Sequence, residues 1–359
     1  MIVFFAPYPI NDEEKKGGLC QRILSIDSLF ENHERIYLTV SYTKYKKPEV
    51  INISDKIIVY RLNALKDYFL IKKLIKKSSL IYLHTIGNAL KYLPYLKPEK
   101  IKVICDMHGV VPEECRMFNQ KIKSFVFNIV EFLTLLKVDY IICVSNNMVK
   151  HFDKKYRLNS FEKIVIPIFT RDRTSCNFDA DSKIKNLVIY AGGTQVWQNT
   201  SEMLDLANDI SSESLPFHFW FPEKDYKKYS NFNLNDNIYF STGSNADVIN
   251  DYMKSCYGLI LRDDNVVNNV ACPTKIVEYL QYGLIPIVKS KEIGDFSQLG
   301  LEYITIFEIK NNVIGDLELK RNINNNVLIK FYKQIDNGIK KLEIISGCEL
   351  KYIKLGKEI

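Results

Sequence analysis

Short, almost continuously apolar segments alternate along this chain with longer segments of helical periodicity. In the first half the apolar segments read IVFFA, RIYLTV, KIIVYRL, LIYLHT, KVICDM, DYIICVS and KIVIPI, with helical periodicity near residues 18–31, 67–77, 114–137 and 146–156. The second half repeats the alternation with NLVIYAGG, FHFWFP, NIYFSTG, YGLILR and LIPIVKS. Runs rich in Val and Ile, separated by helices, predict a parallel sheet that is covered on both faces.

A polar segment without periodicity, FTRDRTSCNFDADSKIKN, separates the two halves and predicts a linker over 169–185. The 359 residues suit two domains. We therefore predict two doubly wound α/β domains, an acceptor domain over 1–168 and a nucleotide-sugar domain over 186–339. A last helical segment follows an Asn-rich loop, and its end, 340–359, is expected to pack back on the first domain.

The charge is concentrated in the first half of the chain. Residues 1–170 hold 27 Lys and Arg against 17 Asp and Glu, a balance of +10 within a net charge of +7. The partner of this half is therefore expected to be anionic. No apolar run of about 18 residues predicts a membrane span. Eight scattered cysteines without a C-x-x-C pair favour reduced thiols and a cytoplasmic setting.

Ligands of doubly wound sheets bind beyond the carboxyl ends of the strands, beside helix N-termini. After the fifth apolar segment, Asp106 and His108 fall on one face of the strand, and Glu113 and Glu114 open the following helix. Grouping these charges at one turn favours a functional site. A capped helix with a surface histidine is the alternative.

Glycine pairs follow the first strand of each predicted domain. Gly17 and Gly18 precede a helix, where backbone amides can approach a phosphate or a sugar, although a plain helix cap explains them about equally well. Gly192 and Gly193 end the strand of YAGGTQVWQN, with Gln195 next to them. This second turn is a candidate contact for a diphosphate or a base.

The segment GLILRDDNVVNNVACPTKIVEYLQYG carries the most specific pattern. Arg262 ends a strand, where a guanidinium can bind a diphosphate. Pro273 suits a first helical turn, which leaves the amides of Thr274 and Lys275 free for an anion. Glu278 lies one turn further on the same face, where its carboxylate can accept both hydroxyls of a ribose. The alternative is a helix with a surface Glu–Lys pair.

Together these residues resemble the retaining nucleotide-sugar glycosyltransferases of the GT-B fold, most closely glycosyltransferase family 4. The resemblance in organisation covers nearly the whole chain. It is specific only in PTKIVEYLQYGLIPIV, with support from DMHG, GGLCQR and YAGG. It implies that Glu278, as the second glutamate of an E-x7-E pattern, binds the donor ribose. Thr274 and Lys275 would contact the donor phosphates, and His108 would approach the transferred sugar. Gly17 and Gly18 match the glycine pair of the family.

The sequence departs from the family at two places. The first glutamate of E-x7-E is replaced by Val270, and Gln195 and Gln198 occupy the region where a basic pair is usual. Arg262 and Lys275 could supply the missing positive charge, and Asn269 could take over a sugar contact. These departures concern the sugar of the donor more than the fold.

The resemblance implies transfer of a hexose, with retention, from a nucleotide diphosphate sugar to a glycan or lipid-linked acceptor in surface polysaccharide synthesis. Asp106, His108, Arg262 and Lys275 would form the catalytic group, with Glu113 and Glu114 towards the acceptor. No metal, no further cofactor and no nucleic-acid partner are expected. An interfacial pattern, Lys72, Lys73, Lys76 and Lys77 beside Phe69, Leu70, Leu74 and Ile75, suggests peripheral attachment to the inner face of the plasma membrane. A solvated lysine face on a packed helix explains this segment about equally well. A catalytically silent GT-B partner subunit and a GT-B-like sugar-nucleotide epimerase are the alternatives.

Overall fold

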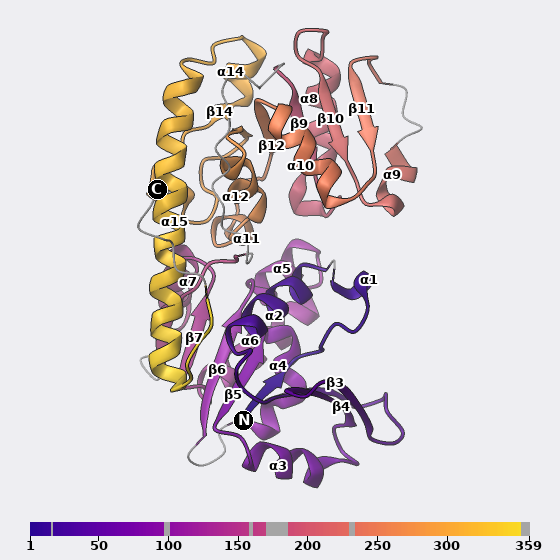
Figure 1. The fold of residues 1–359 in the computed structure, drawn as a ribbon, viewed down its shortest axis with the longest axis vertical. Helices are drawn as coiled ribbons and strands as arrows, with labels where there is room; N and C mark the ends of the chain where they lie inside the picture. Colours follow the sequence, from indigo (N-terminus) through magenta and orange to yellow (C-terminus); the bar gives the residue numbers. More distant parts are fainter. Residues whose placement is uncertain (16, 97–100, 158–160, 170–185, 230–233, 353–359) are drawn as a thin grey trace. The chain divides into compact units, whose positions relative to one another are not determined.

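The computed structural model describes residues 1–15, 17–96, 101–157, 161–169, 186–229 and 234–352. The chain forms two units, each with its own sheet (Figure 1). The first unit comprises Met1–Asp172, Val270–Cys272 and Lys333–Ile359, and the second comprises Arg173–Asn269 and Pro273–Tyr332. Apart from Phe169, the expected linker 169–185 lies outside the described residues.

The first unit holds an eight-stranded sheet in the order β3-β4-β2-β1-β5-β6-β7-β8. Every pairing is parallel except β3 with β4. All residues of β1 and β5 are buried, as expected for strands covered on both faces. The strands are β1 Ile2–Phe5, β2 Arg35–Ser41, β3 Glu49–Ser54, β4 Ile57–Asn63, β5 Leu80–His84, β6 Lys102–Met107, β7 Tyr140–Cys143 and β8 Glu162–Val165.

The helices of this unit confirm three of the four predicted segments. The single helix expected over 114–137 is wrong, because Asn119 adopts a left-handed conformation (φ 56°) that ends α5 and separates it from α6. The helices are α1 Asp12–Lys15, α2 Gly18–Leu29, α3 Tyr68–Lys76, α4 Ile86–Tyr92, the 3-10 turn η1 Leu93–Tyr95, α5 Val111–Met117, α6 Lys121–Leu135 and α7 Asn146–Tyr156.

The second unit holds a six-stranded, all-parallel sheet in the order β11-β10-β9-β12-β13-β14. Its strands are β9 Val188–Ala191, β10 Phe217–Trp220, β11 Ile238–Ser241, β12 Tyr257–Ile260, β13 Ile285–Val288 and β14 Ile304–Thr305. Its helices are η3 Val196–Gln198, α8 Thr200–Ile210, α9 Glu223–Tyr229, α10 Asn245–Lys254, α11 Val266–Asn269, α12 Thr274–Gln281, α13 Phe296–Leu299 and α14 Ile306–Lys310.

The last helix, α15 (Leu317–Ser346), runs from the second unit into the first. It is longer than the pattern indicated, because the Asn-rich stretch 322–326 lies inside it and is not a loop. It also ends earlier than 340–359 implied: Gly347 is left-handed (φ 66°), and the residues from 347 to 352 are not helical. In the described part of the chain, no helix is both long and apolar enough to span a bilayer.

Candidate functional site

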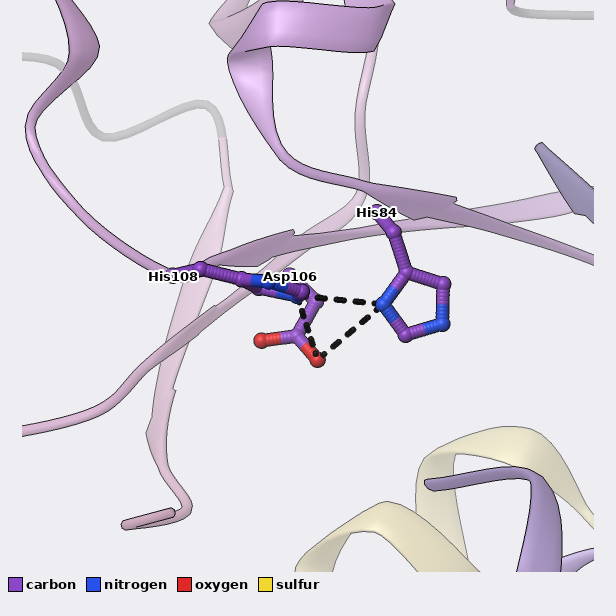
Figure 2. A group of neighbouring side chains, drawn as sticks. All are labelled: His84, Asp106 and His108. Atoms are coloured by element: carbon purple, nitrogen blue, oxygen red, sulfur yellow. Dashed lines mark hydrogen bonds and ion pairs between the residues drawn. The ribbon is translucent and has the colours of Figure 1, made fainter. Parts of the chain in front are cut away.

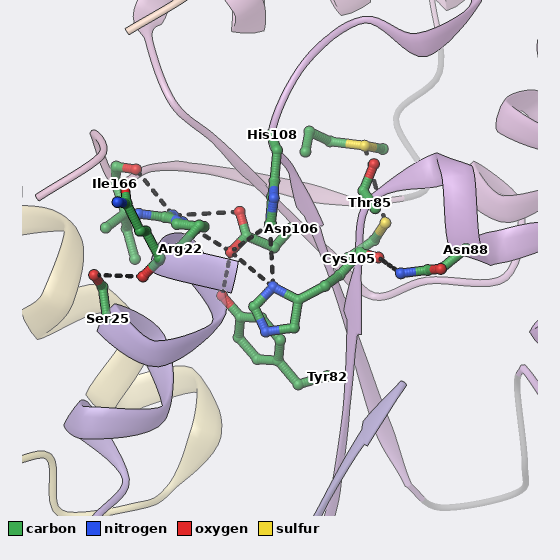
Figure 3. A network of polar contacts seen from close by, with 12 residues as sticks. Arg22, Ser25, Tyr82, Thr85, Asn88, Cys105, Asp106, His108 and Ile166 are labelled. Atoms are coloured by element: carbon green, nitrogen blue, oxygen red, sulfur yellow. Dashed lines mark hydrogen bonds and ion pairs between the residues drawn. The ribbon is translucent and has the colours of Figure 1, made fainter. Parts of the chain in front are cut away.

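In the first unit, a buried ion pair lies at the carboxyl end of β6. Arg22, one turn into α2, directs Nε to Asp106 Oδ2 at 3.1 Å and NH2 to Asp106 Oδ1 at 3.2 Å. The rest of the guanidinium donates to the carbonyl oxygens of Ile166 and Pro167. Burial would raise the pKa of the Asp106 carboxyl, but Arg22 and two neighbouring histidines lower it far below its ordinary value. Asp106 is therefore a fixed negative charge (Figure 3).

Two histidines meet beside this carboxylate. His84 ends β5, His108 follows β6, and His84 Nδ1 lies 3.1 Å from His108 Nε2 (Figure 2). The same two nitrogens lie 3.7 and 3.5 Å from Asp106 Oδ2. Burial lowers the pKa of His84 well below its ordinary value, with further lowering from His108. A neutral His84 can accept a hydrogen bond from His108. His108 is the only partly exposed member of the trio.

The three side chains have the spacing of a metal site. The ligand atoms of His84, Asp106 and His108 all lie within 4.8 Å of one another. The carboxylate also accepts a hydrogen bond from Tyr82 (2.9 Å) and pairs with Arg22. A cation bound there would compete with the guanidinium for the same oxygens. The donor set therefore suits an orienting role for Asp106 at least as well as a ligand role.

The two glutamates expected near the acceptor lie on α5 in different surroundings. Glu113 Oε1 accepts from Lys155 at 2.9 Å, and His151 lies 3.4 Å away. Although burial opposes it, these partners lower the pKa of Glu113 to about 2. Glu114 folds back against Gly109, and burial raises the pKa of its carboxyl. Glu113 thus serves an internal ion pair, which weakens the expectation that it contacts an acceptor.

In the second unit, the ammonium of Lys275 lies at the end of β9. Its Cε and Nζ occupy the space that a Cβ on Gly192 would need, and Nζ lies 5.5 Å from the centre of the Tyr190 ring. Burial lowers the pKa of Lys275; Glu278 counteracts this and Arg262 adds to it. The glycine therefore makes room for a cation from α12 at the carboxyl edge of the sheet.

Arg262 follows β12 at the same edge. It is buried, its NH2 lies 3.4 Å from Oε1 of Gln198, and it influences the pKa of Lys275. Gln198 stands where the resemblance predicts a basic residue, and here its amide oxygen faces an arginine that follows the neighbouring strand. The two expected cations thus belong to one electrostatic group at the ends of β9 and β12.

Glu278 lies one turn into α12, as the sequence predicted. Its Oε2 accepts a hydrogen bond from Tyr252 of α10 at 3.1 Å. Thr274 is the first residue of α12, but Pro273 is its N-cap and not a residue of the first turn. The amides of Thr274 and Lys275 still open the helix, so the expected anion-facing geometry does not depend on this correction.

The remaining predicted positions lie close to these groups or beside helix starts. Gln195 folds over Gly193, and Asn269, the last residue of α11, donates to Asp264 at 2.7 Å. Gly17 is the N-cap of α2, and Gly18 is its first residue. Val270 is buried, and its carbonyl accepts from Ser145 at 2.7 Å, so this position is used for packing in the first unit.

Sequence reasoning missed Arg22, Tyr82, His84 and Tyr252. A signal for His84 existed: β5 and β6 are parallel neighbours, and His84 pairs in register with Asp106. Histidine at the end of LIYLHT could thus have been placed beside DMHG. Tyr82 lies on the same strand and also contacts Asp106, so the same signal applies to it. Arg22 carries no such signal, because its partner Asp106 is 84 residues away in the sequence. A separate hollow in the second unit, lined by Lys291, Tyr303 and others, contains none of the predicted residues.

No protein-family model matches the sequence, and neither does any curated protein. Solved structures match over nearly the whole chain. HepE of Anabaena, in complex with UDP and glucose, has a TM-score of 0.64 at 13% identity and covers 96% of this chain and 99% of its own. Sucrose-phosphate synthase of Thermosynechococcus elongatus has a TM-score of 0.63 at 11% identity, covering 96% and 99%. An α-glucosyltransferase in complex with UDP-glucose and DNA containing an abasic site has a TM-score of 0.57 at 16% identity, covering 96% and 98%.

The chain has the GT-B fold. This confirms the predicted fold class and its two parallel-sheet domains. At these identities the likeness concerns the fold, and assignment to family 4 stays a prediction. Because one matched structure holds DNA, the expectation that this chain has no nucleic-acid partner also stays a prediction.

Proposed function

We propose that the protein is a glycosyltransferase that moves a hexose, with retention, from a nucleotide diphosphate sugar to a glycan or lipid-linked glycan. One observation carries the proposal: Lys275, Arg262 and Glu278 gather at the carboxyl edge of the sheet of the second unit, in a GT-B fold. The two cations suit the diphosphate of a nucleoside diphosphate, and the carboxylate, one helical turn away, suits the hydroxyls of its ribose.

In this proposal the cations act on the leaving group. Lys275 and Arg262, with the first amides of α12, stabilise the charge that develops on the diphosphate when the glycosidic bond breaks. Glu278 accepts the ribose hydroxyls and is oriented by Tyr252. Gly192 and Gly193 leave room for the side chains of Lys275 and Gln195, and Gln195 and Asn269 are further donor contacts. No metal is needed for the leaving group, because the protein supplies the positive charge.

His108 is proposed to orient the transferred sugar. Its Nε2 is held by His84 and Asp106, and Asp106 is held in turn by Arg22. This chain of contacts fixes the imidazole without a strong nucleophile, as expected if the chemistry needs no covalent enzyme intermediate. Gly17, Gly18 and Glu114 are proposed to lie towards the sugar or the acceptor.

The acceptor side is proposed from the charge of the first unit. A basic surface suits an anionic, lipid-linked acceptor in synthesis of capsule, O-antigen or exopolysaccharide, at the cytoplasmic face of the membrane. The matched structures that hold UDP, glucose and UDP-glucose support the donor class, and the sucrose-phosphate synthase supports transfer to a sugar acceptor. The surface-polysaccharide role rests on the resemblance alone.

A thermal-shift screen against UDP-, GDP- and dTDP-sugars tests the donor proposal, because a ligand that binds the folded state raises Tm. One nucleotide class should stabilise the wild type, and Lys275→Met and Glu278→Ala should each reduce the shift. Lys310→Met, which removes an exposed lysine paired with Asp209, is the matched control and should keep it. If no nucleotide sugar stabilises the wild type, the transferase proposal fails.

Turnover separates the alternatives. A transferase should slowly hydrolyse its nucleotide sugar without an acceptor, and this should disappear in Glu278→Ala. A silent partner subunit would bind a sugar or a protein without hydrolysis. An epimerase would convert the sugar nucleotide into its isomer, which proton NMR would detect. Val270 in place of the family glutamate is the feature that favours the silent subunit.

A further inference from the structure

Helix α6 carries a continuous exposed apolar surface in the first unit. Ile122 is 83% exposed and Phe125 68% exposed, so both side chains lie mostly in solvent. Four more large side chains on this helix are exposed by about two fifths or more. The members of this α6 stripe are Ile122, Phe125, Val126, Ile129, Phe132 and Leu133.

The spacing of the α6 stripe places it on one face. At about 100° per residue, its six positions fall within an arc of about 120° and extend for about 17 Å along the helix. The opposite face, with Val130, Glu131 and Thr134, is buried in the unit, where α6 packs beside α4 and α5 (Figure 1). The helix is therefore held in place by one face and presents an apolar face outwards.

The exposed charged residues of α5 and α6 are all basic. Lys121 and Lys123 are exposed at its two edges, and Arg116 is exposed on the adjacent α5. The sole carboxylate of α6, Glu131, is buried on the opposite face and pairs with Lys155. An apolar arc bordered by lysines is the pattern of a helix that lies in the interface of an anionic membrane. A second copy of this surface would bring like charges together.

The lysine-rich helix α3 is a weaker candidate for the same role. Its Ile71, Leu74 and Ile75 are buried in the unit, so its lysines border a packed face, and Phe69 alone projects from the helix as a large exposed apolar side chain. The sequence-based expectation that Leu74 and Ile75 contribute to a membrane surface is therefore wrong. Charge without exposed apolar area gives weaker attachment.

We propose that the α6 stripe inserts into the interface of a bilayer containing anionic lipids and so attaches the protein to the membrane. This inference extends the proposed function, because a lipid-linked acceptor would be presented at such a surface. It does not require activity, since attachment depends on side chains outside the two clusters described above.

Co-flotation of the full chain with vesicles tests the proposal. Wild type should bind phosphatidylcholine vesicles that contain phosphatidylglycerol, and should bind pure phosphatidylcholine far less. The double variant Phe125→Gln with Ile129→Gln should lose about tenfold in partitioning, because it removes two inserting side chains. Phe69→Gln is the matched control and should bind like wild type. All variants should keep the wild-type Tm and nucleotide shift, because the changed side chains are exposed.

Three results would overturn the proposal: no binding of wild type to anionic vesicles, equal binding by the double variant, or a loss shown by Phe69→Gln instead. Light scattering adds a fourth. If the wild type is a dimer, the double variant is a monomer and neither protein binds vesicles, the α6 stripe is instead a contact with a second copy. If the wild type does not bind a nucleotide, the proposed transferase function is contradicted, but the proposal of membrane attachment is not affected.

Discussion

Arg22 and Asp106 form a two-point ion pair in which both side chains are about 1% exposed or less, although 84 residues separate them. Removing one partner of such a pair leaves a buried charge uncompensated. Arg22→Met should therefore lower the free energy of unfolding by about 3–5 kcal/mol, measured by urea denaturation. Adding Asp106→Asn should recover part of this loss. Equal losses in the single and double variants would contradict the pairing.

The matched control is an exposed ion pair in the same unit. Arg61 and Glu49 lie 3.6 Å apart, with side chains 32% and 51% exposed. Arg61→Met should cost less than about 1 kcal/mol, because exposed pairs contribute little. A comparable cost for Arg61→Met would mean that burial is not what makes the Arg22 pair important.

Stability should fall on mild acidification because of His84. Burial lowers its pKa, so the unfolded chain takes up a proton at His84 below about pH 6.5 while the folded protein does not. The contribution of His84 to the free energy of unfolding is therefore complete above pH 6.5. It decreases as the pH falls, by up to about 1.4 kcal/mol per pH unit. Urea denaturation between pH 7.5 and pH 5 should show a flatter slope for His84→Gln. His218 shifts in the same direction and leaves a residual slope.

His33→Gln serves as the control for this pH series. His33 contacts the carbonyl of Glu349 and lies outside the His84 cluster. The wild-type slope should persist in this variant. If His84→Gln keeps the full wild-type slope as well, His84 is not the group that titrates.

Gly192 is expected to matter for binding more than for folding. A Cβ there would overlap the Cε and Nζ of Lys275. These atoms are the flexible end of the lysine side chain and can move away. Gly192→Ala should therefore change the free energy of unfolding by about 1 kcal/mol or less, but lower nucleotide affinity about tenfold by displacing the ammonium. Gly87→Ala, where the nearest atom is 3.8 Å away, is the control. Unchanged affinity in Gly192→Ala, measured by calorimetry, would remove Lys275 from the phosphate site.

Activity is expected to survive metal removal. Asp106 is compensated by Arg22, and Lys275 with Arg262 supplies positive charge for the diphosphate. Turnover in EDTA should therefore equal turnover with added Mg²⁺, Mn²⁺ or Zn²⁺. A different result would show that His84, Asp106 and His108 hold a functional ion: EDTA abolishes activity, one added metal restores it in the wild type, and the same metal does not restore it in His84→Gln.

The fold was largely predictable because it depends on local pattern. Continuous Val/Ile runs such as IVFFA identify strands buried on both faces. Strand β3 was missed because its residues are mostly exposed at an antiparallel edge, where the sequence EVINIS lacks a continuous apolar run. Strand β14 has two residues and gives no pattern. The break after Met117 depends on one left-handed residue, Asn119, and was not visible in the helical periodicity.

The arrangement of the candidate site was predictable where its residues lie within one strand–helix unit. Lys275 and Glu278 follow from the spacing in CPTKIVEYL, and the contact of Lys275 with Gly192 agrees with their shared place at the sheet edge. Arg22 was not predictable, since nothing in GGLCQRI distinguishes an arginine that will be buried against β6. The tertiary partner decides its role, and a single sequence does not contain that pairing.

The proposed contact between Glu278 and the donor ribose can be tested by removing atoms from both sides. Hydrogen bonds to a carboxylate contribute about 1.5–3 kcal/mol, so the 2′- and 3′-deoxy forms of the preferred nucleoside diphosphate should bind wild type about 10–100-fold more weakly than the parent. In Glu278→Ala the three ligands should bind with similar affinity, because the carboxylate that accepts the hydrogen bonds of the ribose is gone. Lys275→Met should weaken all three equally, since it acts on the phosphates. Tyr252→Phe should lie in between, because Tyr252 only orients the carboxylate. If Glu278→Ala keeps the wild-type discrimination in calorimetry, the ribose is bound elsewhere and the orientation of the nucleotide in this unit must be reassigned.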